Sequence, residues 1–138
     1  MFVKICGLSS AEQVQAAVDA GANAVGFVFA DSVRRIDPAD AAAISNTVPD
    51  TIKKVAVMLH PSNEEWEVVL GAFRPDVLQT DAGDFPGLNV PEKIECWPVF
   101  REGNGVTDTQ FSRFVYEGPR SGQGETVDWA RAAKVARR

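Results

Sequence analysis

The stretch FVKICGL, from Phe2 to Leu8, decides how the rest of the chain is interpreted. Its first residues are typical of a buried strand, and Cys6 followed by Gly7 marks the point where the strand ends and a loop opens. Ser9, with a glutamate three residues later, then predicts a capped helix that ends at Ala20–Gly21. If this unit repeats, Cys6 lies at the carboxyl-end rim of a parallel sheet, where βα folds place their chemistry.

Farther along the chain, the apolar residues switch repeatedly between strand and helix periodicity, which is typical of βα units around a parallel sheet. Five more strands are predicted, at residues 24–30, 54–59, 76–80, 95–100 and 114–117. Asp37 predicts the start of one helix, Ser62 with a glutamate three residues later predicts another, and Thr126 or Asp128 caps a last one. Segment 82–91 holds glycine and prolines in place of a clear helix. The sequence therefore predicts an α/β protein with about six βα units in one domain, residues 1–138.

The composition is that of a globular protein without a nucleic-acid surface. The chain has 138 residues, of which 45% are hydrophobic, and this is enough for a core. A net charge of −5 argues against nucleic acid as a partner. Cys6 and Cys96 are too far apart for a CxxC motif and too few for a structural zinc site, so we expect free thiols in a reducing cytoplasm. No apolar run reaches the roughly 18 residues of a membrane span, and no signal-peptide pattern is present.

Four stretches of the chain match one known family in residues and in spacing. They read VKICGL at 3–8, ANAVGFVF at 22–29, SVRRIDP at 32–38 and GETVDW at 124–129, and they resemble phosphoribosylanthranilate isomerase of tryptophan biosynthesis. The resemblance implies a (β/α)8 TIM barrel of about 200 residues. Since six strands are predicted here, it also implies that the sequence stops before the seventh and eighth units, whose loops usually bind the substrate phosphate. Such a chain leaves its first and sixth strands with unpaired edges.

Two residues are candidates for the catalytic acid and base. From the residues alone, a cysteine in an apolar strand is more often an inert core residue, but the resemblance implies that Cys6 is the general base. Related sugar-phosphate isomerase barrels of histidine biosynthesis have an aspartate there, so cysteine favours the tryptophan-pathway substrate. The resemblance places the family's general-acid aspartate at Glu117, which keeps the carboxyl group on a longer side chain. Asp81, where the family often has a histidine, is the alternative acid.

Four further residues are candidates for substrate binding. In the resembling family an arginine in the loop after the second strand faces the anthranilate carboxylate, and Arg34 is in register with it. A guanidinium suits this role because it forms two parallel hydrogen bonds with a carboxylate. Gly7 is a further candidate for substrate binding. The resemblance assigns Gly122 and Gly124 to the phosphate, which agrees with the ability of a glycine-rich turn to present backbone N–H groups to an anion. From composition alone, a solvated arginine pair and a flexible loop remain the alternatives.

The implied reaction is an Amadori rearrangement of N-(5-phosphoribosyl)anthranilate to 1-(2-carboxyphenylamino)-1-deoxyribulose 5-phosphate. It needs no metal or organic cofactor, because the iminium group formed on the substrate is the electron sink. The expected partner is this phosphorylated sugar, and whether the chain is a monomer or a homodimer stays open. Two alternatives remain, namely another phosphosugar isomerase barrel and an inactive barrel fragment that self-associates. His60 is expected to be a solvated loop residue, and Lys4 is left outside the site.

Overall fold

A computed structural model describes residues 1–103, 111–120 and 126–136. Within these ranges six strands form one parallel sheet in which each strand pairs with its neighbour in sequence. The strands are β1 (Lys4–Cys6), β2 (Ala24–Val28), β3 (Lys53–Val57), β4 (Val77–Asp81), β5 (Glu95–Arg101) and β6 (Val115–Glu117). The helices are α1 (Ala11–Asp19), α2 (Pro38–Ile44), α3 (Asn63–Phe73), the 3₁₀ helix η1 (Ala82–Gly87) and α4 (Trp129–Ala136). The six predicted strands are confirmed.

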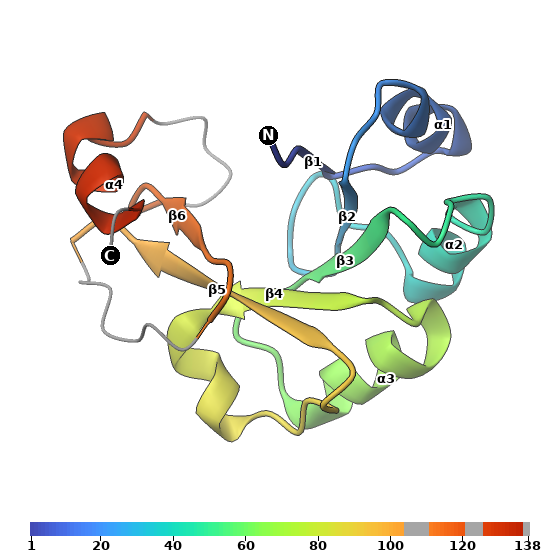
Figure 1. Ribbon diagram of the computed structural model, residues 1–138. Helices are drawn as coiled ribbons and strands as arrows, with labels where there is room; N and C mark the ends of the chain where they lie inside the picture. Colours follow the sequence, from blue (N-terminus) through green and yellow to red (C-terminus); the bar gives the residue numbers. More distant parts are fainter. Residues whose placement is uncertain (104–110, 121–125, 137–138) are drawn as a thin grey trace.

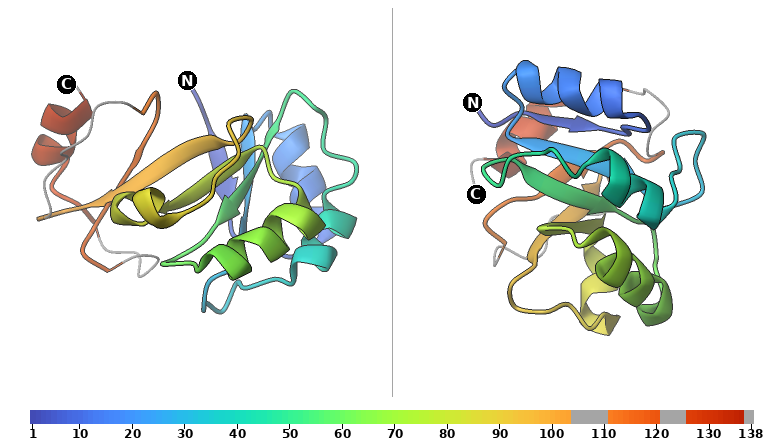
Figure 2. Two further views of the ribbon diagram at one scale, coloured as in Figure 1. Left: turned by 90° about the horizontal axis from the view of Figure 1, so that it is seen from below. Right: turned by 90° about the vertical axis from the view of Figure 1, so that its right-hand side faces the viewer.

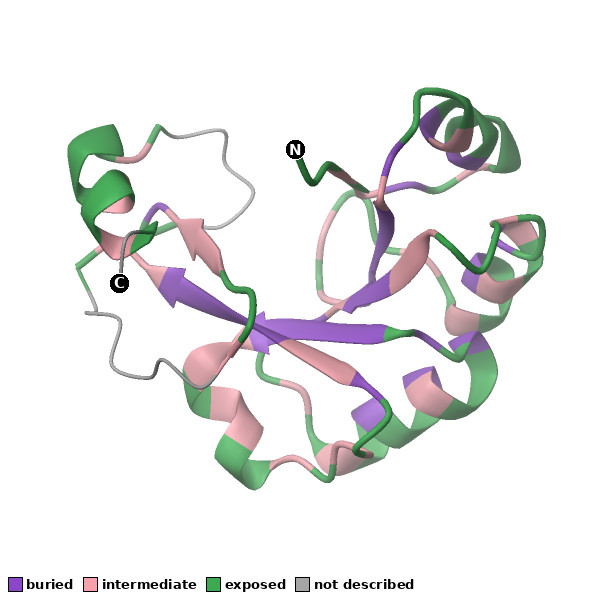
Figure 3. Ribbon diagram, viewed as in Figure 1, coloured by how far each residue is buried: buried purple, intermediate pink, exposed green. Residues whose placement is uncertain are grey.

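The sheet is curved, and α1, α2 and α3 cover its convex side (Figures 1 and 2). All five residues of β2 are buried, as expected for a strand that is covered on both faces. On the convex face Phe27 packs edge-on against Phe73 of α3, with ring centroids 5.1 Å apart, and Trp66 is fully buried beside them. Figure 3 shows that most of β2, β4 and β5 is buried. The convex face therefore holds the main hydrophobic core.

The first strand is less buried than its sequence predicts. Ile5, at the centre of β1, is 38% exposed, and Phe2 and Val3 before it are exposed as well. In the described sheet β1 pairs with β2 alone, so one of its edges has no neighbouring strand to cover it. The prediction of a buried strand was wrong, because an apolar strand is buried only where neighbouring elements cover it.

The predicted helix starts are confirmed with one correction. Asp37 caps α2, and Ser62 with Glu65 forms a complete capping box at the start of α3. Helix α1 is capped by Ser10, whose side chain accepts a hydrogen bond from the backbone N–H of Gln13, and not by Ser9. The capping pair is shifted by one residue because a glutamine, which also suits this motif, follows three residues after Ser10.

The carboxyl-terminal helix α4 begins directly after Asp128. The side chain of Asp128 accepts hydrogen bonds from the backbone N–H groups of Ala130 and Arg131, so Asp128, and not Thr126, is the residue that caps this helix. No residue of α4 is buried, and Trp129 is 74% exposed. The helix therefore adds little to the core described above.

The fifth strand runs through its proline without interruption. Pro98 is fully buried within β5, and the pairing with β6 begins one residue later, at Val99. A proline costs a ladder hydrogen bond, yet β5 continues past Pro98 to Arg101, one residue beyond the predicted end. The segment after β4 forms only η1, in agreement with the prediction that it holds no clear helix.

The concave face of the sheet carries a smaller apolar cluster, Ala24, Val55, Val77 and Trp97. Lys4 points onto this face, where its Nζ donates a hydrogen bond to the side-chain oxygen of Gln79 in β4. At the amino-terminal end of the strands, the guanidinium of Arg113 stacks 4.0 Å above the ring of Phe2. Since Phe2 precedes β1 and Arg113 precedes β6, this contact joins the two edges of the sheet at that end. Among the described helices, none is long and apolar enough to cross a membrane.

Candidate active site

Four candidate residues lie at the carboxyl ends of strands or directly after them. Cys6 is the last residue of β1 and Glu117 the last residue of β6. Asp81 ends β4, and Arg34 lies in the loop after β2. Because all six strands run parallel, these ends gather at one rim of the sheet. The two candidate catalytic residues therefore belong to the two edge strands of the described sheet.

Close packing holds the thiol of Cys6 in place. Cys6 pairs with Gly26 in the β1–β2 ladder, and both residues are on the concave face. A Cβ atom added to Gly26 would lie 2.9 Å from Cys6 Sγ and 3.4 Å from Cys6 Cα. Any side chain at residue 26 would therefore displace the thiol. The glycine provides the space that Cys6 occupies.

The turn after Cys6 brings Arg34 beside it. Gly7 adopts a φ of +78°, a conformation that favours glycine, and its N–H donates to the carbonyl of Gly26 at 2.9 Å. A Cβ atom on Gly7 would lie 2.7 Å from Cδ of Arg34 and 2.9 Å from Nη1. The Arg34 side chain is thus packed over Gly7, one residue from the candidate base. The structure brings three of the predicted site residues together at this point.

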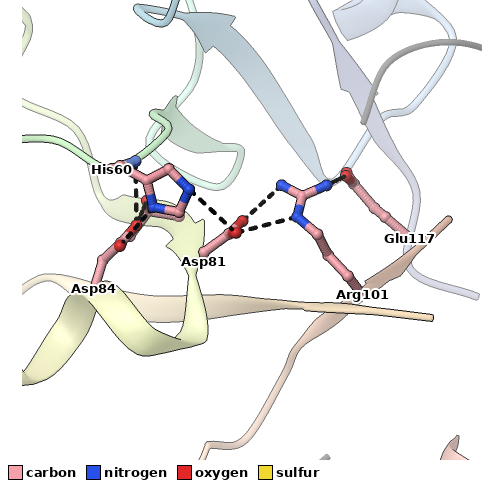
Figure 4. A network of polar contacts seen from close by, with 6 residues as sticks. His60, Asp81, Asp84, Arg101 and Glu117 are labelled. Carbon is pink, nitrogen blue, oxygen red and sulfur yellow. Dashed lines mark hydrogen bonds and ion pairs between the residues drawn. The ribbon is translucent and has the colours of Figure 1, made fainter. Parts of the chain in front are cut away.

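On the other side of the rim, Arg101 links two carboxylates (Figure 4). Its Nε donates to Asp81 Oδ2 at 3.1 Å and its Nη2 to Asp81 Oδ1 at 2.7 Å, which is a bidentate fork. Its Nη1 lies 3.6 Å from Glu117 Oε2. The hydrogen bond with Asp81 is the main cause that raises the pKa of Arg101 above its usual value, so the guanidinium stays charged.

His60 extends this group of charges toward β3. Its Nδ1 lies 2.8 Å from Asp84 Oδ1, and its Nε2 lies 3.7 Å from Asp81 Oδ2. Asp84 also accepts a hydrogen bond from Thr80 Oγ1 at 2.6 Å. The hydrogen bond with Asp84 raises the pKa of His60 above its ordinary value of 6.5, although the side chain is 65% exposed. The expectation of a solvated histidine is right about exposure but missed the two carboxylates.

Two residues of this charged group, Arg101 and Asp84, are not among the candidates predicted from the sequence. Arg101 directly follows the strand predicted at residues 95–100, whereas in the structure it is the last residue of β5. A signal was nonetheless present, since a cation and an anion that end two adjacent parallel strands reach the same rim. Asp84 lies three residues beyond the end of β4, in η1, where no sequence pattern marked it.

The predicted phosphate contacts Gly122 and Gly124 lie outside the described residues. In the parts of the chain that the structure describes, no three His, Cys, Asp or Glu side chains are arranged to hold a metal ion. A pocket of about 360 Å³, lined in part by Phe2, Lys4, Trp97 and Arg113, lies toward the amino-terminal end of the strands. It is separate from the carboxyl-end rim.

Comparison with known proteins gives one consistent result. Residues 3–138 match the family model described as N-(5′-phosphoribosyl)anthranilate (PRA) isomerase. An N-(5′-phosphoribosyl)anthranilate isomerase of Streptococcus pneumoniae (strain Hungary19A-6) is 37% identical over 131 residues, which cover 92% of this chain and 65% of the relative. The chain thus spans about 65% of the length of the curated relatives that it matches.

Solved structures show the same similarity in three dimensions. The phosphoribosyl anthranilate isomerase of Thermus thermophilus superposes with a TM-score of 0.82 at 27% identity, covering 99% of this chain and 72% of that protein. A second isomerase of this kind, in complex with reduced 1-(o-carboxyphenylamino)-1-deoxyribulose 5-phosphate, gives a TM-score of 0.73 at 23% identity, covering 98% of this chain and 70% of that one. The predicted fold class is confirmed, since the six described strands form part of this barrel architecture.

Proposed function

The chain belongs to the N-(5′-phosphoribosyl)anthranilate isomerase family, and on that premise we propose that its carboxyl-end rim performs the Amadori rearrangement of N-(5-phosphoribosyl)anthranilate. The observation that carries the proposal is the packing of Arg34 over Gly7, directly after Cys6. It places a group suited to a carboxylate next to a group suited to take a proton. The anthranilate carboxylate would lie on Arg34, with the sugar extending over the concave face.

In this proposal Glu117 is the general acid. It protonates the ring oxygen of the furanose while the amine nitrogen supplies the electron pair that breaks the bond between C1 and that oxygen. The product of this step is an open-chain iminium ion. Glu117 ends β6 on the far edge of the sheet, so acid and base approach the substrate from the two edge strands. Asp81 remains the alternative acid, but both of its oxygens accept hydrogen bonds from Arg101.

Cys6 then acts as the base. Its thiolate removes the proton from C2, and the electron pair of that C–H bond moves to the iminium to give an enolamine. Tautomerisation of the enolamine yields the ketone at C2. The substrate supplies the electron sink, and each positioned acid or base contributes on the order of 10²–10⁴ in rate. Phosphate binding would fall to Gly122 and Gly124 and to two further βα units of the kind that complete this barrel family.

The test compares turnover of the chain with that of a chimera. In the chimera, residues 1–138 are followed by the remaining third of the Streptococcus pneumoniae relative. We expect essentially no turnover by the chain alone and clear turnover by the chimera, because a phosphate held by backbone N–H groups is a large part of substrate binding. A folded chimera without isomerase activity would refute the proposed function. If the chain alone turned over substrate nearly as efficiently as the chimera, the role given to the added units would be refuted.

Variants of the active chimera assign the individual roles. Cys6→Ser is nearly isosteric, and we expect it to lower kcat by roughly 10²–10⁴, because a hydroxyl group is a far weaker base than a thiolate. Arg34→Ala removes a charged hydrogen-bond pair of roughly 1.5–3 kcal/mol, which corresponds to a KM about 10–150 times higher with little change in kcat. Arg35→Ala, which removes an adjacent exposed arginine, is the control.

A second candidate is a fragment that associates with another copy of itself. It is favoured by the exposed apolar residues Phe2, Val3 and Ile5 at the β1 edge and by Trp129 on α4. An unpaired parallel edge offers N–H and C=O groups to a neighbouring chain. Light scattering after size exclusion separates the two cases, since a monomeric chain would exclude this candidate.

A further inference from the structure

Arg101 lies between the two candidate acids, and the scheme above gives it no role. We propose that Arg101 is a positioning residue that fixes the carboxyl group of Glu117 at the rim, and that Asp81 is the anchor that fixes Arg101. The catalytic meaning of this inference rests on the proposed function. The geometry that supports it, however, is independent of any reaction.

The anchor is the fork between Arg101 and Asp81. Two roughly parallel hydrogen bonds, of 3.1 and 2.7 Å, align the plane of the guanidinium with the plane of the carboxylate. The side chains are 16% and 19% exposed, so bulk water competes only weakly for these bonds. A fork of this kind uses one edge of the guanidinium and leaves Nη1 free to face a second group.

Glu117 is the group that Nη1 faces. The two residues are opposite each other in the β5–β6 register, and the carbonyl of Glu117 accepts a hydrogen bond from the backbone N–H of Glu102 at 2.8 Å. The backbone of Glu117 is therefore held by β5. Its side chain has three rotatable bonds, and the Nη1–Oε2 approach of 3.6 Å is an ion pair that favours one of the possible directions. Arg101 thus favours one position of the carboxyl group.

A histidine and a second carboxylate lie near the anchor but outside the fork. His60 Nε2 lies 3.7 Å from Asp81 Oδ2, and Asp84 holds the imidazole through Nδ1. Asp84 forms no fork with Arg101, although its charge acts on the guanidinium. Asp84→Asn is therefore a matched control for Asp81→Asn, because both remove one negative charge from the same area and only the latter removes the fork.

The experiment measures the side-chain carboxyl ¹³C resonance of Glu117 in the 138-residue chain. We expect Arg101→Met to shift this resonance, and Asp81→Asn to shift it as well, although Asp81 reaches Glu117 only through the guanidinium. In the Arg101→Met background, Asp81→Asn should add no further shift. Arg101→Lys should not restore the original signal, because an ammonium group cannot form the fork. Asp84→Asn should leave the resonance nearly unchanged. Arg131→Met, which removes an exposed arginine of α4 and serves as the control for Arg101→Met, should also leave it nearly unchanged.

Two results would overturn the inference. One is a Glu117 resonance that does not respond to Arg101→Met. The other is a shift on Asp81→Asn that is equally large with and without Arg101, since that would show a direct effect of charge. Amide spectra establish that each variant is folded, and if Arg101→Met is not, the same cycle is run with Arg101→Lys.

Kinetics of the chimera then separate this inference from the proposed function. A carboxyl group displaced by about 1 Å costs up to roughly 10²-fold in rate, so Arg101→Met should lower kcat by about 10–100-fold with little change in KM. Coupling in the spectra without any isomerase activity would refute the function and leave the positioning role intact. An active chimera whose kcat is insensitive to Arg101→Met would refute the catalytic role of Arg101 alone.

Discussion

The two sides of the rim are held by different forces. On the β1–β2 side, Cys6 fills the space left by Gly26, and Arg34 lies over Gly7. On the β4–β6 side, Arg101 holds two carboxylates by charge. Close packing is short-ranged and insensitive to pH and salt, whereas ion pairs respond to both. An added atom should therefore destabilise the β1–β2 side, whereas removal of a charge should destabilise the β4–β6 side.

The largest loss of stability is expected for Gly26→Ala. Its new Cβ would lie 2.9 Å from Cys6 Sγ, so β1 or the thiol must move, and overpacking of this kind costs about 1–3 kcal/mol. Urea unfolding should show this loss at low and at high salt alike. Gly71→Ala, where an added Cβ meets nothing within 4 Å, is the control and should not destabilise the chain. A loss for Gly26→Ala that depends on salt would contradict the distinction between the two sides.

The second-largest loss of stability is expected for Asp81→Asn. The substitution leaves the partly buried guanidinium of Arg101 without its fork, and the loss of charge-assisted hydrogen bonds, reduced by the remaining solvent access, should cost about 1–2 kcal/mol. Urea unfolding at low and high salt measures it, and the difference from wild type should shrink as salt rises. A loss that is equal at both salt concentrations would mean that packing dominates on this side too.

Gly7→Ala should have a smaller effect, of about 1 kcal/mol. A non-glycine residue at a φ of +78° is strained, while the atoms that its Cβ meets belong to the flexible end of Arg34 and can move aside. Thermal unfolding measures the stability. In the active chimera the displaced Arg34 should raise KM, whereas Gly21→Ala, at a φ of +77° with no atom within 4 Å, should cost similar stability without changing KM.

The smallest effect is expected for His60→Gln, because an exposed ion pair contributes only about 0.2–1 kcal/mol. The pKa of His60 is raised in the folded chain, chiefly by its hydrogen bond with Asp84. Its contribution to stability is therefore complete below the unfolded pKa of about 6.5 and is lost as pH rises through the folded pKa. The stability difference between wild type and His60→Gln should be larger at about pH 5.5 than at about pH 8.5. An inverse trend would mean that the histidine is held in its neutral form.

The sequence predicted the fold well where local patterns decide it. The unbroken apolar run of β2 and the capping box at Ser62 both correspond to observed structure. Burial of β1 was predicted wrongly, because its apolar residues say nothing about whether a further strand lies beside them. Pro98 does not interrupt β5, since a buried strand tolerates a proline just before the residue at which the next strand begins to pair.

The site residues on the β1–β2 side of the rim were predicted from the sequence. Cys6, Gly7 and Arg34 follow the ends of the first two strands, and their resemblance to a known family marked them together. The contact between Arg101 and Asp81 joins residues 20 positions apart, and it depends on where β5 ends. Local periodicity defines strand ends only to within a few residues, so this pair was not identified. The choice between Glu117 and Asp81 as acid stays a prediction.

The order of the sheet also bears on how the chain acquires its structure. Because β1 to β6 are neighbours in the order in which they are synthesised, each new strand meets the edge formed by the strand before it. A nascent chain can thus add one βα unit at a time, because each described strand pairs with the strand that precedes it in sequence. The separation in sequence between paired strands stays small, which favours fast folding. In the described sheet, the edges that must be kept from other chains during synthesis are that of β1 and that of the most recently formed strand.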